Sequence, residues 1–104
     1  MTNQEQLEAV MGLIIHSGNA KSEAVEAIEA AKNGDLENAM NKLDVAGEAL
    51  LQAHHSQTEM LTKEAQGQRT EMNLLTVHSQ DHLMTSIAFT DMAKEIVDLY
   101  KRIS

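Results

Sequence analysis

The chain contains no proline, and turn residues interrupt its helical pattern at only two places. Proline breaks helices more strongly than any other residue, so its absence from 104 residues permits long uninterrupted helices. Apolar residues recur at helical spacing before and after Asn33-Gly34-Asp35, and again after Gly67. The strong helix formers Ala, Glu, Leu, Gln, Lys and Met dominate, and no run alternates β-branched or aromatic residues with polar ones. The sequence therefore predicts an all-α protein.

Local signals at the helix ends define one domain, residues 1–104, with helices at about 3–33, 36–66 and 71–103. The starts are predicted from a Thr-x-x-Glu capping box at Thr2, an N-cap at Asp35 and a further cap at Thr70. Gly34 and Gly67 are typical stops, whereas Ser-Gly-Asn at 17–19 indicates a bend within the first helix. Short connections make consecutive helices antiparallel neighbours, so we expect an up-down-up three-helix bundle.

The charge and the composition exclude several classes of function. A net charge of -8 argues against binding to nucleic acid or to an anionic membrane surface, because both need a basic protein surface. No apolar run reaches about 18 residues, so we expect no direct membrane insertion. The N-terminal stretch MTNQEQLEAV has neither the basic start nor the apolar core of a signal peptide. The absence of cysteine fits a cytoplasmic protein and excludes disulfides.

The third predicted helix has more apolar surface than one chain needs. On a helical wheel its apolar arc is roughly 180–200° wide, against the roughly 100° that a surface helix presents to a single core. Leu83 and Ile87 are exceptions that fall near the polar side. We take the polar side to consist of Thr76, Gln80, Thr90, Asp91, Lys94, Asp98, Lys101 and Arg102. The surplus of apolar surface predicts contact with another chain.

Three titratable residues, His78, Asp81 and His82, project from this wide arc. Asp81 lies on the seam made by Leu74, Val77, Met84 and Ala88, where an unpartnered carboxylate would be costly to desolvate. It needs a cation, a hydrogen-bond network, or its own symmetry mates around a metal. Three copies of Asp81 on a three-fold axis could share one hard divalent cation such as Mg²⁺ through oxygen ligands.

Two chemistries fit the spacing of His78 and His82, which share a helix face. Their separation matches a zinc-binding pair, but Ser79 follows His78 where a zincin has its catalytic Glu, so only simple chelation remains. Alternatively, one imidazole is a nucleophile that takes a phosphoryl group, and His82 or Gln80 donates to the phosphate. Alternatively, one of the two histidines is a satisfied interface residue and the other a structural hydrogen-bonder. We interpret His16, His54 and His55 as ordinary surface or interface residues.

The stretch TVHSQDHLMTS strongly resembles the active-site helix of enzyme IIA of the lactose/cellobiose (N,N'-diacetylchitobiose) class of the bacterial sugar phosphotransferase system. VMGLIIHSGNAKSEA and EALLQAHHSQTEMLTKEA are similar to the first two helices of that family. The resemblance covers essentially the whole chain. Ser79 departs from it, because many members have Ala there.

The resemblance implies a homotrimer in which His78 accepts a phosphoryl group from the histidine-containing phosphocarrier protein and passes it to a cysteine of enzyme IIB. It also implies that Asp81 lies at the trimer axis, where lactose-type members bind a divalent metal, and that His82 and Gln80 surround the active histidine. The start of the chain is closer to the cellobiose/chitobiose branch than to lactose members, so we expect a β-linked disaccharide. A helical adaptor and a small His/Asp metal-binding bundle are the rival interpretations.

Overall fold

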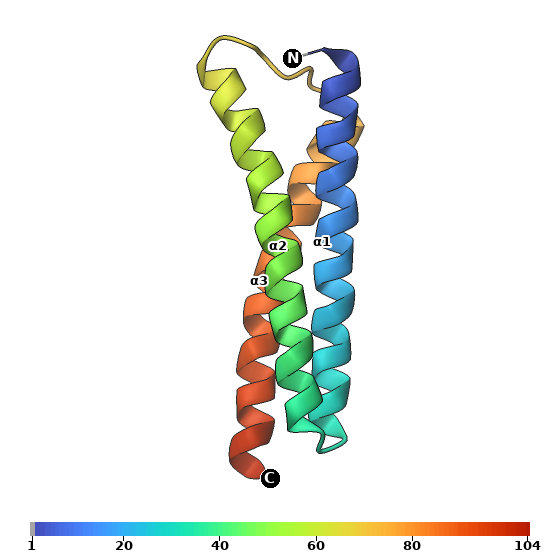
Figure 1. Ribbon diagram of the computed structural model, residues 1–104, viewed down its shortest axis with the longest axis vertical. Helices are drawn as coiled ribbons and strands as arrows, with labels where there is room; N and C mark the ends of the chain where they lie inside the picture. The colour runs from blue at the N-terminus through green and yellow to red at the C-terminus, as the bar shows by residue number, and fades with distance from the viewer. Residues whose placement is uncertain (1) are drawn as a thin grey trace.

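The computed structural model describes residues 2–104, which form three helices joined by two short connections (Figure 1). The helices are α1 (Asn3–Lys32), α2 (Leu36–Ala65) and α3 (Leu74–Ile103). In Figure 1 α1 runs down, α2 runs up and α3 runs down, so α1 and α3 are parallel, and the all-α prediction is confirmed. The molecule is a rod of 52 × 18 × 18 Å. None of the described helices has the length and apolarity needed to cross a membrane.

Four of the five predicted signals at helix ends are confirmed, namely those at Thr2, Asp35, Gly34 and Gly67. The Thr2 hydroxyl accepts a hydrogen bond from Glu5 N, and an Asp35 carboxylate oxygen accepts one from Asn38 N. Gly34 and Gly67 have φ values of +82° and +89°, a conformation that glycine adopts without strain. At the end of α1, Gly34 N donates to Ala31 O and Asp35 N donates to Ala30 O, which is the Schellman pattern that ends many helices.

The start of the third helix was predicted wrongly. Asn73, not Thr70, is the N-cap, because its side-chain oxygen accepts from Thr76 N at 2.9 Å. The α-helix therefore begins at Leu74 rather than at residue 71. Thr70 is instead buried in the connection that crosses the top of the bundle (Figure 1). Asn and Thr are both favourable N-cap residues, and Asn73 is the cap here because it directly precedes the helix.

Two apolar cores lie along the rod. The lower core is rich in alanine, with Ala24, Ala27, Ala39 and Ala46 fully buried between α1 and α2. The upper core contains larger residues, including Leu13, Met60 and Leu83. Small side chains allow α1 and α2 to approach closely, and α1 packs more extensively on each of its partners than α2 and α3 pack on one another. Despite Gly18 and the expected bend, α1 is one continuous helix.

The buried face of α3 is only partly the one predicted, because two residues of the predicted polar side are buried while Asp91, Lys94, Asp98, Lys101 and Arg102 are exposed. Thr76 and Thr90, assigned to the polar side, are buried together with Leu83, and the inner face is completed by Ser79, Ser86, Ala93 and Val97. The wheel misplaced these two threonines because it sorted side chains by polarity, whereas the residues of α3 that pack within the chain are mostly small. The hydroxyls of Ser17, Ser86 and Thr90 find no hydrogen-bond partner among the described residues, so this interior is unusually polar.

Candidate functional site

His78 and His82 lie one turn apart on α3 with their rings stacked, at a centroid separation of 5.6 Å and an interplanar angle of 15°. His78 is exposed and His82 is half-buried. Neither imidazole makes a hydrogen bond to any residue from 2 to 104, so their ring nitrogens are free for a ligand. The structure thus brings the two predicted histidines into one pair with parallel rings.

Helix α1 forms the floor beneath His82. A Cβ added to Gly18 would lie 3.4 Å from Nε2 of His82, so the imidazole rests almost directly on the α1 backbone. Sequence reasoning interpreted this glycine only as a weak point in the helix. The signal that could have found its function was an unexplained glycine inside a helix, which often marks a close approach.

The first turn of α3 is fixed to α1 by a buried glutamine. Gln6 Nε2 donates to Glu71 O at 2.8 Å and to Thr76 Oγ1 at 3.0 Å, while Glu71 N donates back to Gln6 Oε1. One turn further, the buried Ser79 hydroxyl donates to Thr76 O at 2.6 Å. These bonds hold the segment that carries His78, and Ser79 fits the inner face with its hydroxyl satisfied.

Gln80 lies on a different side of α3 from His78. The two positions are about 200° apart on the helix, so they cannot reach one ligand within a subunit. Gln80 is half-buried against α2, where its Oε1 accepts a hydrogen bond from Gln57 Nε2 at 2.8 Å. Gln57 was missed in the sequence, because a contact between side chains 23 residues apart leaves no mark in helical periodicity.

Asp81 is exposed on the outer face of α3, at the centre of an apolar stripe. Leu74 is 85% exposed and Met84 is 55% exposed, and the stripe continues through Val77, Ala88, Met92, Leu99 and Ile103. The predicted seam therefore exists and is uncovered by this chain. A continuous apolar stripe of this kind is typical of an interaction surface.

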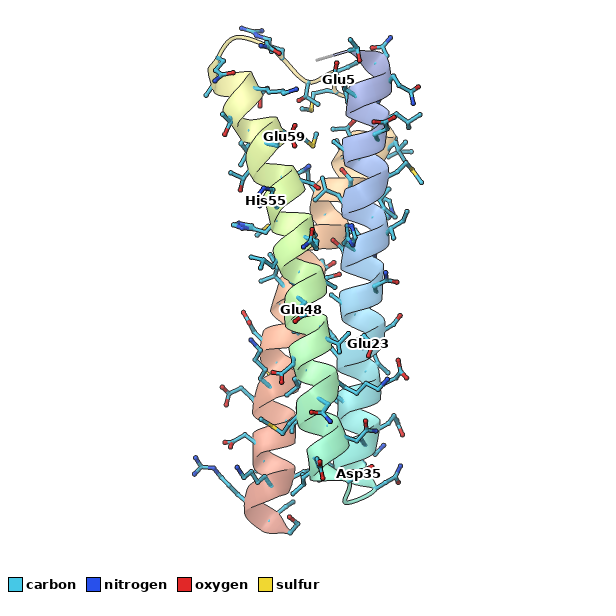
Figure 2. All side chains as sticks on the ribbon, in the orientation of Figure 1. Glu5, Glu23, Asp35, Glu48, His55 and Glu59 are labelled. Carbon is cyan, nitrogen blue, oxygen red and sulfur yellow. The ribbon has the colours of Figure 1, made fainter. Side chains whose placement is uncertain are left out.

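The donor set for a metal is incomplete in one subunit. No group of three or more His, Asp or Glu side chains with metal-binding geometry occurs among residues 2–104. The Asp81 carboxylate has no partner among residues 2–104, and it fits a divalent cation only if copies of Asp81 converge from other chains. His54 and His55 are exposed on α2, where His55 is labelled in Figure 2, and His16 is half-buried on α1.

The comparisons with known proteins agree on one family. The model of the lactose/cellobiose-specific IIA subunit of the phosphotransferase system matches residues 8–101. The lichenan-specific phosphotransferase enzyme IIA component of Bacillus subtilis is 51% identical over 98% of this chain and 93% of its own length. The chain therefore belongs to the lactose/cellobiose-specific IIA family of the sugar phosphotransferase system.

Solved structures support the same assignment. The cellobiose-specific enzyme IIA from Bacillus anthracis superposes with a TM-score of 0.93 at 43% identity, covering 99% of this chain and 93% of that one. The chitobiose-specific IIA of Escherichia coli, solved in complex with HPr, has a TM-score of 0.82 at 38% identity and covers 94% and 95%. The predicted family and the three-helix fold are thus confirmed.

Proposed function

We propose that this chain is a phosphoryl carrier in which His78 is the acceptor. The observation that carries the proposal is the exposed, unbonded imidazole of His78, stacked on His82 beside an uncovered apolar stripe. A neutral imidazole is an available nucleophile near pH 7, and phosphoryl transfer depends mainly on positioning and charge stabilisation. An exposed ring suits a group that must meet two different protein partners.

The transfer consists of two balanced exchanges. A ring nitrogen of His78 attacks the phosphorus carried by the histidine-containing phosphocarrier protein, so one N–P bond forms as the other breaks. A cysteine thiolate of enzyme IIB then attacks the same phosphorus, and the His78 N–P bond breaks as an S–P bond forms. In this proposal His82, whose ring is stacked on that of His78, donates a hydrogen bond to the phosphoryl oxygens.

A homotrimer completes the site in this proposal. The apolar stripe on α3 is the surface through which three copies pack, with the Asp81 carboxylates converging on the axis. His78 and Gln80 flank this stripe on opposite sides, so each His78 faces the Gln80 side of a neighbouring subunit. A divalent cation held by three Asp81 side chains would neutralise their charge and tie the subunits together; it takes no part in the transfer.

The sugar that we propose is a β-linked disaccharide of the cellobiose or chitobiose type rather than lactose. The support is the lichenan- and cellobiose-specific names of relatives that are 51% and 43% identical. The sugar itself contacts other components of the system, so those components, and not this chain, would determine the sugar specificity.

The test is incubation with phosphoenolpyruvate, the upstream kinase and the phosphocarrier protein, followed by intact mass. The wild-type chain and His55→Ala should each gain one phosphoryl group, whereas His78→Ala should gain none and keep its helical content. A helical adaptor would never be phosphorylated, and a metal-binding bundle would instead carry stoichiometric metal after purification. A phosphohistidine retained in His78→Ala would refute the assignment.

A further inference from the structure

Gln57 and Gln80 form a side-chain hydrogen bond that joins α2 to α3 beside the proposed site. The donor Nε2 of Gln57 is 2.8 Å from Oε1 of Gln80, and both side chains are half-buried. Within residues 2–104 this is the only bond between side chains of α2 and α3, the two helices that pack least on one another. The bond lies at the edge of a pocket whose apolar lining includes Met60, Leu61 and Met72. Shelter from water strengthens such a bond.

The polarity of this bond determines what Gln80 can offer to a ligand. An amide has one acceptor oxygen and one donor NH2 group. Because Gln57 donates, the oxygen of Gln80 is occupied, and its NH2 group has no partner in the described subunit. Gln80 therefore presents a donor, which is the group that can bind a phosphoryl oxygen.

We propose that Gln57 is a positioning residue, which holds the amide of Gln80 with its NH2 group toward the phosphoryl group on His78 of a neighbouring subunit. This rests on the proposed function and on the trimer. A preorganised donor stabilises the charge on the transferring group without reorganising during the reaction. Without Gln57 the Gln80 amide is free to rotate and to present its oxygen, which would repel the phosphoryl oxygens.

Gln57→Glu inverts the polarity, because a carboxylate at this position can only accept. Gln80 would then donate to residue 57 and turn its own oxygen toward the phosphate. We expect the saturating single-turnover rate of phosphoryl transfer to fall about tenfold or more. The phosphocarrier concentration that gives half the maximal rate should not change, because in this proposal Gln57 acts on the transfer step and not on binding of the phosphocarrier. Gln52→Glu, an equal change of charge at an exposed site on the same helix, should keep the wild-type rate.

Repeating the Gln57 substitutions in a chain that lacks the Gln80 amide shows whether their effect on the transfer rate depends on Gln80. The double variant Gln80→Met with Gln57→Glu should transfer the phosphoryl group at the same rate as Gln80→Met alone. Gln57→Met removes the donor without adding charge, so it should give a smaller loss that also disappears in Gln80→Met. A wild-type rate for Gln57→Glu, or slowing that persists in Gln80→Met, would overturn the proposal. Absence of phosphorylation in the wild-type chain would instead refute the proposed function.

Discussion

The Nε2 atom of His82 lies 3.4 Å from the point where a Cβ on Gly18 would be, which is ordinary van der Waals distance. A methyl group fits there, but a larger side chain does not. The half-buried imidazole on α3 thus packs against a part of α1 that carries no side chain.

Gly18→Ala should raise the free energy of unfolding by about 0.5–1 kcal/mol, because alanine loses less backbone entropy in a helix. Its phosphoryl transfer rate should equal that of the wild type. Gly18→Leu should displace His82 and slow the transfer. Gly47→Ala is the matched control, since nothing lies within 4 Å of its Cβ position, and it should stabilise without any kinetic effect. Chemical denaturation and single-turnover rates measure both properties. Equal rates for Gly18→Leu and wild type would contradict a role for His82.

Mixed trimers test whether the site is shared between subunits. His78→Ala should be inactive and Gln80→Met slow, but subunit exchange between them should restore rapid transfer. Mixed trimers contain sites that combine an intact His78 from one chain with an intact Gln80 from another. The rate should rise with time of exchange and then become constant. A mixture no faster than the sum of its separate components would show that Gln80 does not act across an interface.

Asp81→Leu should preserve or strengthen the trimer, because it removes up to three buried like charges from the axis. Sedimentation at decreasing protein concentration measures the equilibrium, with Asp44→Leu on α2 as a control that should not change it. A chelator should weaken the wild-type trimer if a divalent cation is bound, and it should have no effect on Asp81→Leu. Dissociation of Asp81→Leu into monomers would mean that the carboxylate or its metal is an essential tie.

Asn73→Ala should cost about 1 kcal/mol of unfolding free energy, since it removes the side-chain acceptor for Thr76 N. Fraying of this first turn would also loosen the segment that carries His78. Asn38→Ala, an exposed Asn near the start of α2 whose side chain caps no helix among the described residues, is the control and should cost less. Urea denaturation gives both values, and an equal cost for the two variants would argue against the cap.

The pH dependence of stability should include a contribution from Glu5, labelled at the upper end of α1 in Figure 2. The hydrogen bond from Lys63, 3.2 Å from Glu5 Oε2, lowers the pKa of this carboxyl below 4.5, and the Thr2 hydroxyl adds to the shift. A depressed pKa in the folded state stabilises the protein above the unfolded value. The contribution is therefore complete well above pH 4.5 and is lost as the pH falls through the folded pKa.

Glu5→Gln should accordingly lower the urea midpoint at neutral pH, and its difference from wild type should shrink on acidification below pH 4.5. The effect is small because the group is exposed. Glu48→Gln, at a residue without an ion pair in the described chain, should show no such convergence. A constant difference across the pH range would rule out this ion pair as the cause.

The fold was largely predictable because its signals are local. Thr2, Asp35, Gly34 and Gly67 act on backbone groups within a few residues, so the sequence alone located both ends of the first two helices but not the start of the third. The inner face of α3 was not predictable, because which face packs within the chain depends on the small residues of α1. The histidine pair followed from helical spacing, but the preference for His78 came only from family resemblance, and the Gln57 contact arises from tertiary packing.

Helix α3 buries serine and threonine within its own chain and leaves leucine and methionine in water. In the proposed trimer, this exposed apolar surface is the one at which the copies join. While a chain has no copy to pair with, this surface is open to contact with unrelated amphipathic helices. Association of the proposed trimer depends on concentration, so the fraction of chains with this surface covered should rise with the expression level.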